Sequence, residues 1–347
     1  MTVGQVRGKV GLMCIRPSMK RLLIGTRRLL LASRLDRLAR AATGRRHIVL
    51  TFHRVRPDGE ALDSYDTCPS LPTGVFRCLL KWLKSHFEIL PLEELVRTRS
   101  VSRPAAAVTF DDGWQDNFSL AYPVLRELNI PATVFVTTAK IGSYSPFWQQ
   151  NLGKLFRGAT AEPTSNRARD LRQVLATGSN PSFTPEAYRA TVTKWKDLPI
   201  AEVDRRLSQA GWSPSENSEA TRSFLSVDEI REMAREGISF GSHTVNHLIL
   251  PVQPSDILSR ELANSRQDLE AILGTSVTTI AYPNGDWSAD VVRCAASVGY
   301  RVGCTTRHGR LTTRSASLLI PRIEPEWDCP ECGDTFDARS LEWLAKW

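Results

Sequence analysis

The stretch Ala105-Ala-Ala-Val-Thr-Phe-Asp-Asp-Gly113 joins a run of mostly apolar residues to two acidic residues and a glycine. A short apolar run that ends in a turn signal is typical of a buried strand. Asp111 and Asp112 then stand at its carboxyl end, where two like charges in a poorly solvated position repel each other. A divalent cation would relieve that repulsion. Asp-Asp-Gly is also a common turn sequence, so the motif alone leaves both interpretations open.

Runs of the same kind recur along the chain and alternate with stretches of helical periodicity. The other expected strands are 47–53, 132–136, 238–241, 278–282, 301–305 and 318–323. The expected helices are 76–87, 121–128, 228–235, 255–273 and 289–298. Strands that alternate with helices at this spacing indicate an α/β fold built on a parallel sheet or barrel.

The alternation lapses between about residues 145 and 223, where Gly, Pro, Ser, Thr and Asn are frequent. Helical stretches follow one another there without apolar strands between them. We interpret this region as an insertion of short helices and loops. Its tryptophans Trp148, Trp195 and Trp212 offer flat faces for sugar rings, but large aromatic residues in such a segment more often form its core.

Two further polar clusters also follow expected strands, Ser242-His-Thr-Val-Asn-His247 and Ala281-Tyr-Pro-Asn-Gly285. In α/β folds, catalytic groups collect at the carboxyl ends of the strands. His243 and His247 face one point if their segment is helical or if it loops back on itself. Imidazole nitrogen is a standard zinc ligand, although a histidine pair considered alone is more often structural or exposed.

Taken together, the clusters supply two imidazoles and a carboxylate, the ligand set of a catalytic metal with open positions. A second aspartate is then left to act as a base. A metal of this kind lowers the pKa of a bound water toward about 7 and polarises a carbonyl oxygen. The neighbouring carboxylate takes the proton of the attacking water. The expected chemistry is therefore metal-dependent hydrolysis.

Thr109-Phe-Asp-Asp-Gly113 followed by His243-Thr-Val-Asn-His247 resembles the motifs of the polysaccharide deacetylases, carbohydrate esterase family 4, which share the NodB-homology domain. The resemblance extends over about residues 47–325. It implies a distorted (β/α) barrel, a divalent metal (usually zinc, sometimes cobalt or nickel) and hydrolysis of an N-acetyl or O-acetyl group on a glycan. By position, Asp111 is implied as the general base, and Asp112, His243 and His247 as the metal ligands.

The chain departs from the family pattern at the third motif, which often begins with an arginine that orients the base. The matching segment here reads Ala281-Tyr-Pro-Asn-Gly285, a Tyr-Pro-x-Gly form that resembles a subgroup acting on exopolysaccharides. We expect Tyr282 to offer its backbone N–H to the oxyanion. Arg322, in Ile320-Pro-Arg-Ile323, is the expected replacement for the absent arginine.

A second departure concerns the general acid, which the family usually takes from a Leu-x-His motif near the end of the domain. No such motif follows residue 300, but Leu50-Thr-Phe-His53 stands at the end of the first expected strand. This arrangement resembles circularly permuted members of the family. We therefore expect His53 to protonate the leaving amine, with His308 as the alternative. A buried strand-end histidine without a catalytic role is the plain interpretation of His53.

Residues 1–46 carry the positive charge of the chain. They hold twelve Lys and Arg against Asp36, a net +11, and the whole chain is +8, so residues 47–347 sum to 8 − 11 = −3. The leucines and arginines of 19–42 suit either a cationic helix on an anionic membrane surface or a helix packed on the catalytic domain. Arginines interrupt each apolar stretch, so a secretory signal fits poorly. We expect a cytoplasmic protein, free or peripheral to the inner face of the membrane.

The seven cysteines do not form an expected disulfide framework, because their number is odd and no secretory signal is expected. Cys329-Pro-Glu-Cys332 has the spacing of half a zinc knuckle. A structural zinc site normally needs two such halves. We expect no metal there.

The sequence thus predicts a zinc-type hydrolase, in a domain over residues 47–347, that deacetylates N-acetylhexosamine units of a glycan or lipid-linked glycan. Two alternatives stay open: a metal-dependent hydrolase of a small amide or cyclic imide, and a non-catalytic glycan-binding protein. Nucleic-acid binding would rest on the basic segment alone, since no recognition motif accompanies it.

Overall fold

The computed structural model describes residues 47–98, 104–175, 182–196, 198–213, 222–312 and 315–325. The basic segment 1–46 and the Cys329/Cys332 pair lie outside these residues, so membrane contact by residues 1–46 stays a prediction. Four cysteines among the described residues, Cys68, Cys78, Cys294 and Cys304, are free thiols. Within the same ranges, no helix combines the length and the apolar composition that crossing a bilayer requires.

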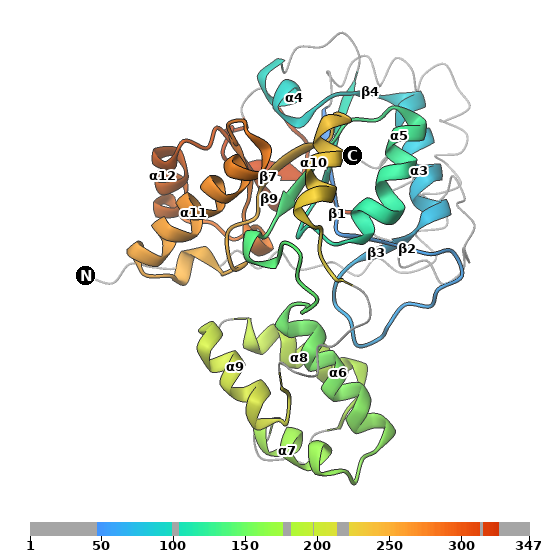
Figure 1. Cartoon of the computed structure of the whole chain (residues 1–347), viewed down its shortest axis with the longest axis vertical. Helices are drawn as coiled ribbons and strands as arrows, with labels where there is room; N and C mark the ends of the chain where they lie inside the picture. The colour runs from blue at the N-terminus through green and yellow to red at the C-terminus, as the bar shows by residue number, and fades with distance from the viewer. Residues whose placement is uncertain are drawn as a thin grey trace, which may run out of the picture. The chain divides into compact units, whose positions relative to one another are not determined.

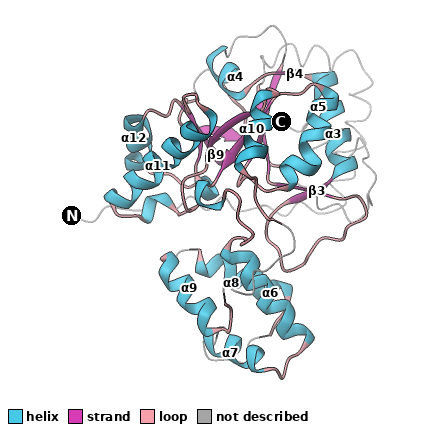
Figure 2. Cartoon of the chain, viewed as in Figure 1, coloured by secondary structure: helices cyan, strands magenta, loops and turns pink. Residues whose placement is uncertain are grey.

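The predicted parallel sheet is confirmed (Figure 2). In spatial order its strands are β1 (Ile48–Phe52), β5 (Ala105–Phe110), β6 (Ala132–Val136), β7 (Ser239–Ser242), β8 (Thr279–Ala281), β9 (Val302–His308) and β10 (Ile320–Arg322), with β4 (Glu88–Ile89) pairing β5. A parallel bridge joins Leu50 of β1 to Ile323 just after β10. The sheet therefore nearly closes on itself, as expected for a distorted (β/α) barrel.

Burial on both faces explains why the strands read as continuous apolar runs. Each residue of β1, β5 and β6 is buried. Along β5, Ala106 and Val108 belong to the core beneath the helices, whereas Ala105 and Ala107 belong to a second core. The second core combines small and large apolar side chains, among them Phe135, and fills the interior of the barrel.

Helices cover the outside of the sheet (Figure 1). They are α3 (Thr73–His86), α4 (Leu92–Thr98), α5 (Tyr122–Leu128), α10 (Val227–Arg235), α11 (Ser255–Leu273) and α12 (Ala289–Val298). Local signals set their ends: Ser226 and Glu229 form a capping box at the start of α10. Gly274 and Gly299 adopt the left-handed conformation that ends α11 and α12.

Two short strands that the sequence pattern did not predict follow β1. β2 (Arg54–Arg56) and β3 (Ser70–Pro72) pair in parallel as a separate two-stranded sheet. Each has three residues, and β3 ends in proline, so neither shows the length or the alternation that identifies a strand. The loop between them, 57–69, lies near the site described below.

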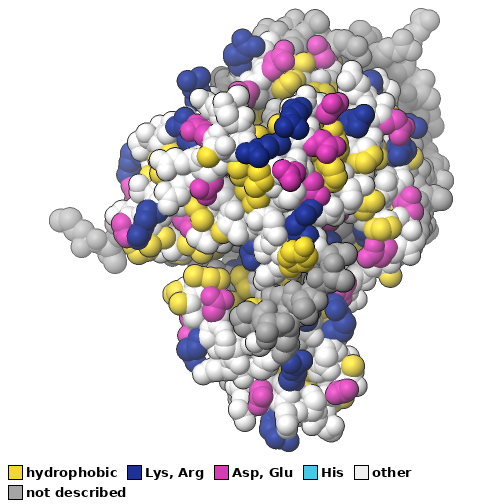
Figure 3. All heavy atoms as spheres, viewed as in Figure 1, with side chains coloured by type: hydrophobic (Ala, Val, Ile, Leu, Met, Phe, Trp, Pro, Cys, Tyr) yellow, Lys and Arg dark blue, Asp and Glu magenta, His cyan; other side chains and the backbone are white. Residues whose placement is uncertain are grey.

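Residues 148–209 form a group of four helices, drawn in green to yellow-green in Figure 1. They are α6 (Trp148–Ala161), α7 (Asn166–Leu175), α8 (Pro185–Trp195) and α9 (Ile200–Gln209). Their apolar faces share one core, in which Trp195 is buried and Trp148 and Trp212 pack at the margin. Figure 3 shows basic and acidic side chains interspersed over the face of the described residues that it views.

Candidate metal centre and active site

Asp112, His243 and His247 come together at the carboxyl end of the sheet. Asp112 follows β5, and both histidines follow β7. The Nε2 atoms of His243 and His247 each lie 3.4 Å from Asp112 Oδ1, and one ligand atom from each residue falls within 4.8 Å of the others. Ligands bound about 2.0–2.1 Å from a tetrahedral zinc are separated by roughly 3.3 Å. The group therefore fits a single divalent cation.

Hydrogen bonding prepares the histidines to act as ligands. His243 Nδ1 lies 2.8 Å from the carbonyl oxygen of Ala281. Because a carbonyl only accepts hydrogen bonds, Nδ1 carries the hydrogen and Nε2 keeps the lone pair that a metal needs. Burial lowers the pKa of His247 below its usual value, which favours the neutral ring.

The second oxygen of Asp112 is held by an indole. Trp114 Nε1 donates to Asp112 Oδ2 at 2.9 Å, which leaves Oδ1 facing the two histidines. Burial opposes ionisation of Asp112, but contacts with His243 and His247 outweigh burial and hold its pKa well below the usual range. Asp112 has a φ of 75° and Gly113 a φ of 79°, a conformation that costs free energy for a residue with a side chain. The backbone turn thus serves to aim the carboxylate.

His243 and His247 converge because their segment loops back; it is not helical. Thr244 and His247 have φ values of 65° and 58°, and Thr244 Oγ1 accepts the backbone N–H of His247 at 3.0 Å. The buried Glu261 carboxylate of α11 accepts the backbone N–H groups of Val245 and Asn246 at 3.0 and 2.9 Å. It also accepts the side-chain amide of Asn246 at 2.7 Å. Glu261 therefore fixes the loop that carries both imidazoles.

Replacing Glu261 with alanine is expected to weaken metal binding by about 10–100-fold, because the groups that orient ligands contribute that much to affinity. Competition of zinc against a chromophoric chelator measures the change. Glu270→Ala on the same helix is the matched control, since Glu270 accepts the N–H of Val277 instead. Equal zinc affinity of Glu261→Ala and the wild type would show that the loop carrying His243 and His247 keeps its conformation without Glu261.

Asp111 lies beside the metal-binding group formed by Asp112, His243 and His247, and it forms a bidentate ion pair with Arg322. Arg322 Nη1 donates to Asp111 Oδ1 at 2.7 Å, and Nη2 donates to Oδ2 at 2.6 Å. Arg322 Nε donates to the carbonyl of Thr305 at 3.0 Å, which fixes the guanidinium. Burial would raise the pKa of Asp111, but the charge and hydrogen bonds of Arg322 lower it. The result is an ionised carboxylate of fixed orientation next to the metal-binding group.

The polysaccharide deacetylase family model matches residues 98–303. This span is more than half of the chain and contains Asp111, Asp112, His243 and His247. The chain belongs to the polysaccharide deacetylase family. The resemblance noted in the sequence is therefore confirmed for the family, and the exopolysaccharide-type subgroup stays a prediction.

Individual relatives agree with this family membership. The chain is 21% identical to the Bacillus subtilis protein YxkH over 258 residues, 73% of this chain and 64% of that protein. It is 32% identical over 108 residues to the poly-beta-1,6-N-acetyl-D-glucosamine N-deacetylase of Staphylococcus epidermidis. That match covers 28% of this chain and 37% of that protein. The chain thus spans less than two thirds of the length of both relatives.

Solved structures show the same fold. The Streptococcus pyogenes deacetylase PplD in complex with acetate matches with a TM-score of 0.55 and 18% identity, covering 86% of this chain and 97% of that one. IcaB from Ammonifex degensii matches with a TM-score of 0.53 and 16% identity, covering 88% and 97%. At these identities the likeness concerns the polysaccharide deacetylase fold alone.

His53 and His308 lie in different surroundings in this polysaccharide deacetylase domain. His53 follows β1, its side chain is 20% exposed, and its Nδ1 lies 3.1 Å from Glu324 Oε1. Burial would lower its pKa, but contact with the Glu324 carboxylate and the charges of Asp112 and Asp111 raise it to about 9. His308 is an exposed residue at the end of β9. His53 is therefore a histidine whose pKa is shifted by the site carboxylates Asp111 and Asp112.

The expected oxyanion contact from Tyr282 is wrong. Its backbone N–H donates to the carbonyl of Cys304 at 3.0 Å, as a rung between neighbouring strands. The phenol is also buried, and a side chain at Gly303 would come within 2.7 Å of its hydroxyl oxygen. Tyr282 is a core residue of the barrel, because the sheet hydrogen-bonding continues one residue past β8.

Three residues of the site escaped the sequence analysis: Trp114, Glu261 and Glu324. The sequence did contain a signal for Trp114, because it follows Asp-Asp-Gly directly and a buried indole N–H needs a hydrogen-bond acceptor. Glu324 stands two residues after Arg322, on the same side of an extended chain as that arginine. Glu261 had no local signal, because a single acid within a long helix is ordinary.

Proposed function

We propose that this chain is a metal-dependent hydrolase that removes N-acetyl groups from N-acetylhexosamine units of a glycan. The observation that carries the proposal is the Asp111–Arg322 pair beside the Asp112, His243 and His247 group. That arrangement provides a cation site and, next to it, a separate carboxylate kept ionised and oriented. Membership of the polysaccharide deacetylase family supports the same chemistry.

One carboxylate and two imidazoles suit Zn²⁺ best, and Co²⁺ or Ni²⁺ accept the same donors. When bound, the metal supplies Lewis acidity: it polarises the acetyl carbonyl and lowers the pKa of a water molecule toward about 7. Asp112, through Oδ1, and His243 and His247, through Nε2, would hold the ion. Trp114 and Ala281 keep those atoms in place through the hydrogen bonds described above.

Asp111 takes the proton of the attacking water. Each carboxylate oxygen has two lone pairs, and Arg322 occupies one on each oxygen. One acceptor position per oxygen is therefore left. Because the guanidinium contacts both oxygens, the carboxylate cannot rotate away from the reacting centre.

His53 gives a proton to the nitrogen of the leaving amine. Glu324 contacts Nδ1, so Nε2 is the nitrogen that can donate to substrate. A histidine with a raised pKa is protonated at neutral pH, which is the state a general acid needs. Residues 47–97 and 304–325 lie outside the family match, so the roles of His53, Glu324 and Arg322 rest on the geometry of this chain.

The pH dependence of turnover tests the role of His53. Its pKa is raised to about 9, so the acid is present below this pH and is lost as pH rises through it. A cation on Asp112 lowers the value by adding positive charge nearby. Glu324→Gln removes a group that raises the pKa, so the alkaline limb of the kcat profile is expected to move to lower pH. If the alkaline limb of the kcat profile stays at the same pH in Glu324→Gln, His53 is not the general acid. His308→Ala is then the next variant to measure.

The glycan assignment draws on the relatives, one of which is named a poly-beta-1,6-N-acetyl-D-glucosamine N-deacetylase. Acetate release from N-acetylglucosamine oligomers tests it, with O-acetylated oligomers, small linear amides and cyclic imides as competing substrates. We expect release from N-acetylated oligomers at the highest kcat/KM. Turnover of the imide or the small amides alone would replace the glycan with a small-molecule substrate, and binding of oligomers without release from any substrate would indicate a glycan-binding protein.

A further inference from the structure

The short strand β2, which begins directly after His53, pairs with another strand along one edge only. On that edge it pairs with β3, and the backbone N–H of Arg54 donates to the carbonyl of Pro69 at 3.2 Å. Backbone groups of a strand point to its two edges in turn, so the carbonyl of His53 and the N–H of Val55 point to the other edge. Within the described ranges no strand lies along that edge. A two-stranded sheet this short is marginally stable by itself.

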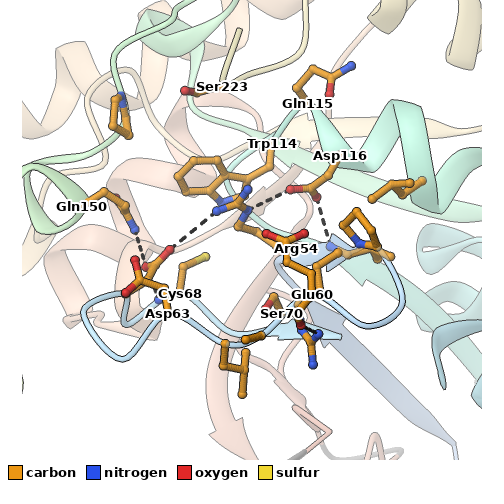
Figure 4. Close-up of a pocket in the computed structure, with 18 of the residues that line it drawn as sticks. Arg54, Glu60, Asp63, Cys68, Ser70, Trp114, Gln115, Asp116, Gln150 and Ser223 are labelled. Carbon is orange, nitrogen blue, oxygen red and sulfur yellow. Dashed lines mark hydrogen bonds and ion pairs between the residues drawn. The ribbon is translucent and has the colours of Figure 1, made fainter. Parts of the chain in front are cut away.

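Asp116 and Asn117 supply the hydrogen bonds that a further strand would make. Asp116 Oδ1 accepts the N–H of Val55 at 3.0 Å, and Asn117 Nδ2 donates to the carbonyl of His53 at 2.9 Å. Asp116 Oδ2 accepts Arg54 Nε at 2.8 Å. Figure 4 shows the Asp116 carboxylate joined by dashed lines to the Arg54 guanidinium and to the strand below it. The two side chains therefore fix the backbone on both sides of Arg54.

Asp116 and Asn117 are themselves held in the interior. Asp116 is 8% exposed and Asn117 is 1% exposed, and Asn117 Nδ2 also donates to Asp116 Oδ1 at 3.1 Å. Asn117 begins a π-helical turn, η1 (Asn117–Ala121), a rare conformation that is frequent at functional sites. Burial raises the pKa of Asp116, and the Arg54 charge and the hydrogen bonds offset this only in part. Burial of this carboxylate thus costs folding free energy, and its hydrogen bonds lead to the strand that follows His53.

His53 stands where the chain leaves the barrel. Before it, the carbonyl of Phe52 accepts the N–H of Asp111 at 2.9 Å, which fixes the end of β1 against β5. Its ring contacts Glu324 through Nδ1 at 3.1 Å, and the Glu324 side chain is 45% exposed. An ion pair with so exposed a partner holds a side chain weakly. The place of His53 Nε2 therefore depends on how firmly the backbone that follows His53 is fixed.

We propose that Asp116, together with Asn117, is a positioning residue for proton transfer from His53. The inference rests on the proposed function, in which His53 protonates the leaving amine. Asp116 acts through the backbone of β2 and not through contact with substrate. A displacement of about 1 Å at a reacting group lowers a rate by about 10²-fold. Loss of Asp116 is therefore expected to lower kcat and to leave KM unchanged.

A competing route from Asp116 to the reaction runs through Trp114. The Arg54 guanidinium lies 4.7 Å from the centroid of the Trp114 ring, and Trp114 Nε1 donates to Asp112 Oδ2 at 2.9 Å. If Asp116 acted by this route, its loss would weaken zinc binding. Positioning of His53 predicts an unchanged zinc affinity, so zinc affinity separates the two routes.

A double-mutant cycle on acetate release by the full-length zinc protein tests the proposal. Asp116→Asn is expected to lower kcat by about 10–100-fold, with KM and zinc affinity unchanged, and Asn117→Ala should act in the same direction. In a His53→Ala background, Asp116→Asn should leave kcat unchanged, because no acid remains to be positioned. Asp63→Asn is the matched control, since Asp63 pairs with Arg157, and it should keep wild-type kcat. Circular dichroism establishes that each variant folds.

An equal loss of kcat from Asp116→Asn with and without His53 would overturn the proposal. Wild-type kcat in a folded Asp116→Asn protein would overturn it too, as would a fall in its zinc affinity that matches the fall in kcat. Wild-type kcat in His53→Ala would exclude His53 as the acid and Asp116 as its positioning residue.

The imidazole C–H signals of His53 test the positioning without turnover. In the metal-free protein, with the signals assigned from His53→Ala, we expect one sharp set in the wild type and broadened or multiple signals in Asp116→Asn. Identical signals in the two proteins would overturn the positioning of the ring. Absence of acetate release from the wild-type zinc protein, with the expected change in these signals, would contradict the proposed function and leave the positioning of the ring supported.

Discussion

Replacing Asp111 with asparagine is expected to lower kcat for acetate release by about 10²–10⁴-fold, the usual contribution of a general base, while the protein still binds one metal ion. Asparagine keeps the shape of the side chain but cannot take a proton from water. The three metal-binding residues stay in place, since none of them contacts Asp111 through a hydrogen bond or ion pair that the structure identifies. Metal content by atomic emission and steady-state acetate release measure the two effects.

Asp111→Asn also leaves the buried Arg322 guanidinium without its anionic partner. Loss of one member of a buried ion pair costs about 3–5 kcal/mol of folding free energy, so the melting temperature is expected to fall as well. Asp268→Asn on α11 makes the same chemical change at an exposed acid that accepts the Thr138 hydroxyl. Activity should survive in that control. A folded Asp111→Asn protein with wild-type kcat would exclude Asp111 as the base.

Replacing His243 with alanine is expected to remove both the metal and the activity. His243 supplies one of three ligand atoms and is 2% exposed, so no water-exposed group replaces it without rearrangement. Lewis-acid catalysis contributes several kcal/mol to the rate, and each 1.36 kcal/mol is tenfold, so turnover should fall by at least about a thousandfold. Dialysis against buffered zinc, followed by metal analysis and an acetate assay, measures both quantities.

The matched control for His243→Ala is His86→Ala, which removes an exposed imidazole from α3. That variant should keep its metal and its turnover. The contrast between Asp111→Asn and His243→Ala separates the two functions of the site, because the first variant keeps metal and the second loses it. Full zinc content in a folded His243→Ala protein would show that the metal is bound elsewhere.

Sequence patterns predicted the parts of this site that depend on short-range order. Asp111 and Asp112 end one strand, and His243 and His247 lie within five residues of each other after another. Parallel strands bring their carboxyl ends to one edge. A correct strand order was therefore not needed to expect these side chains together. The apolar strands themselves were recognisable because both of their faces are buried.

Contacts between distant segments could only be guessed or were missed. Arg322 and Asp111 are 211 residues apart, and their pairing requires β10 to lie next to β1 across the closing bridge. Glu261 reaches the histidine loop from a helix whose sequence is unremarkable. The Tyr282 amide was assigned to the oxyanion from the local Tyr-Pro-x-Gly motif, but it donates to the carbonyl of Cys304 on the neighbouring strand, a contact between distant segments that the motif does not reveal.

The central claim is that one metal ion, held by Asp112, His243 and His247, is required for deacetylation. The most direct test strips the purified protein with a chelator, titrates zinc back, and follows acetate release from N-acetylglucosamine tetramers against zinc bound. The claim predicts no release from the metal-free protein and a linear return of activity that ends at one zinc per chain. Full activity in protein shown to contain no metal would contradict it.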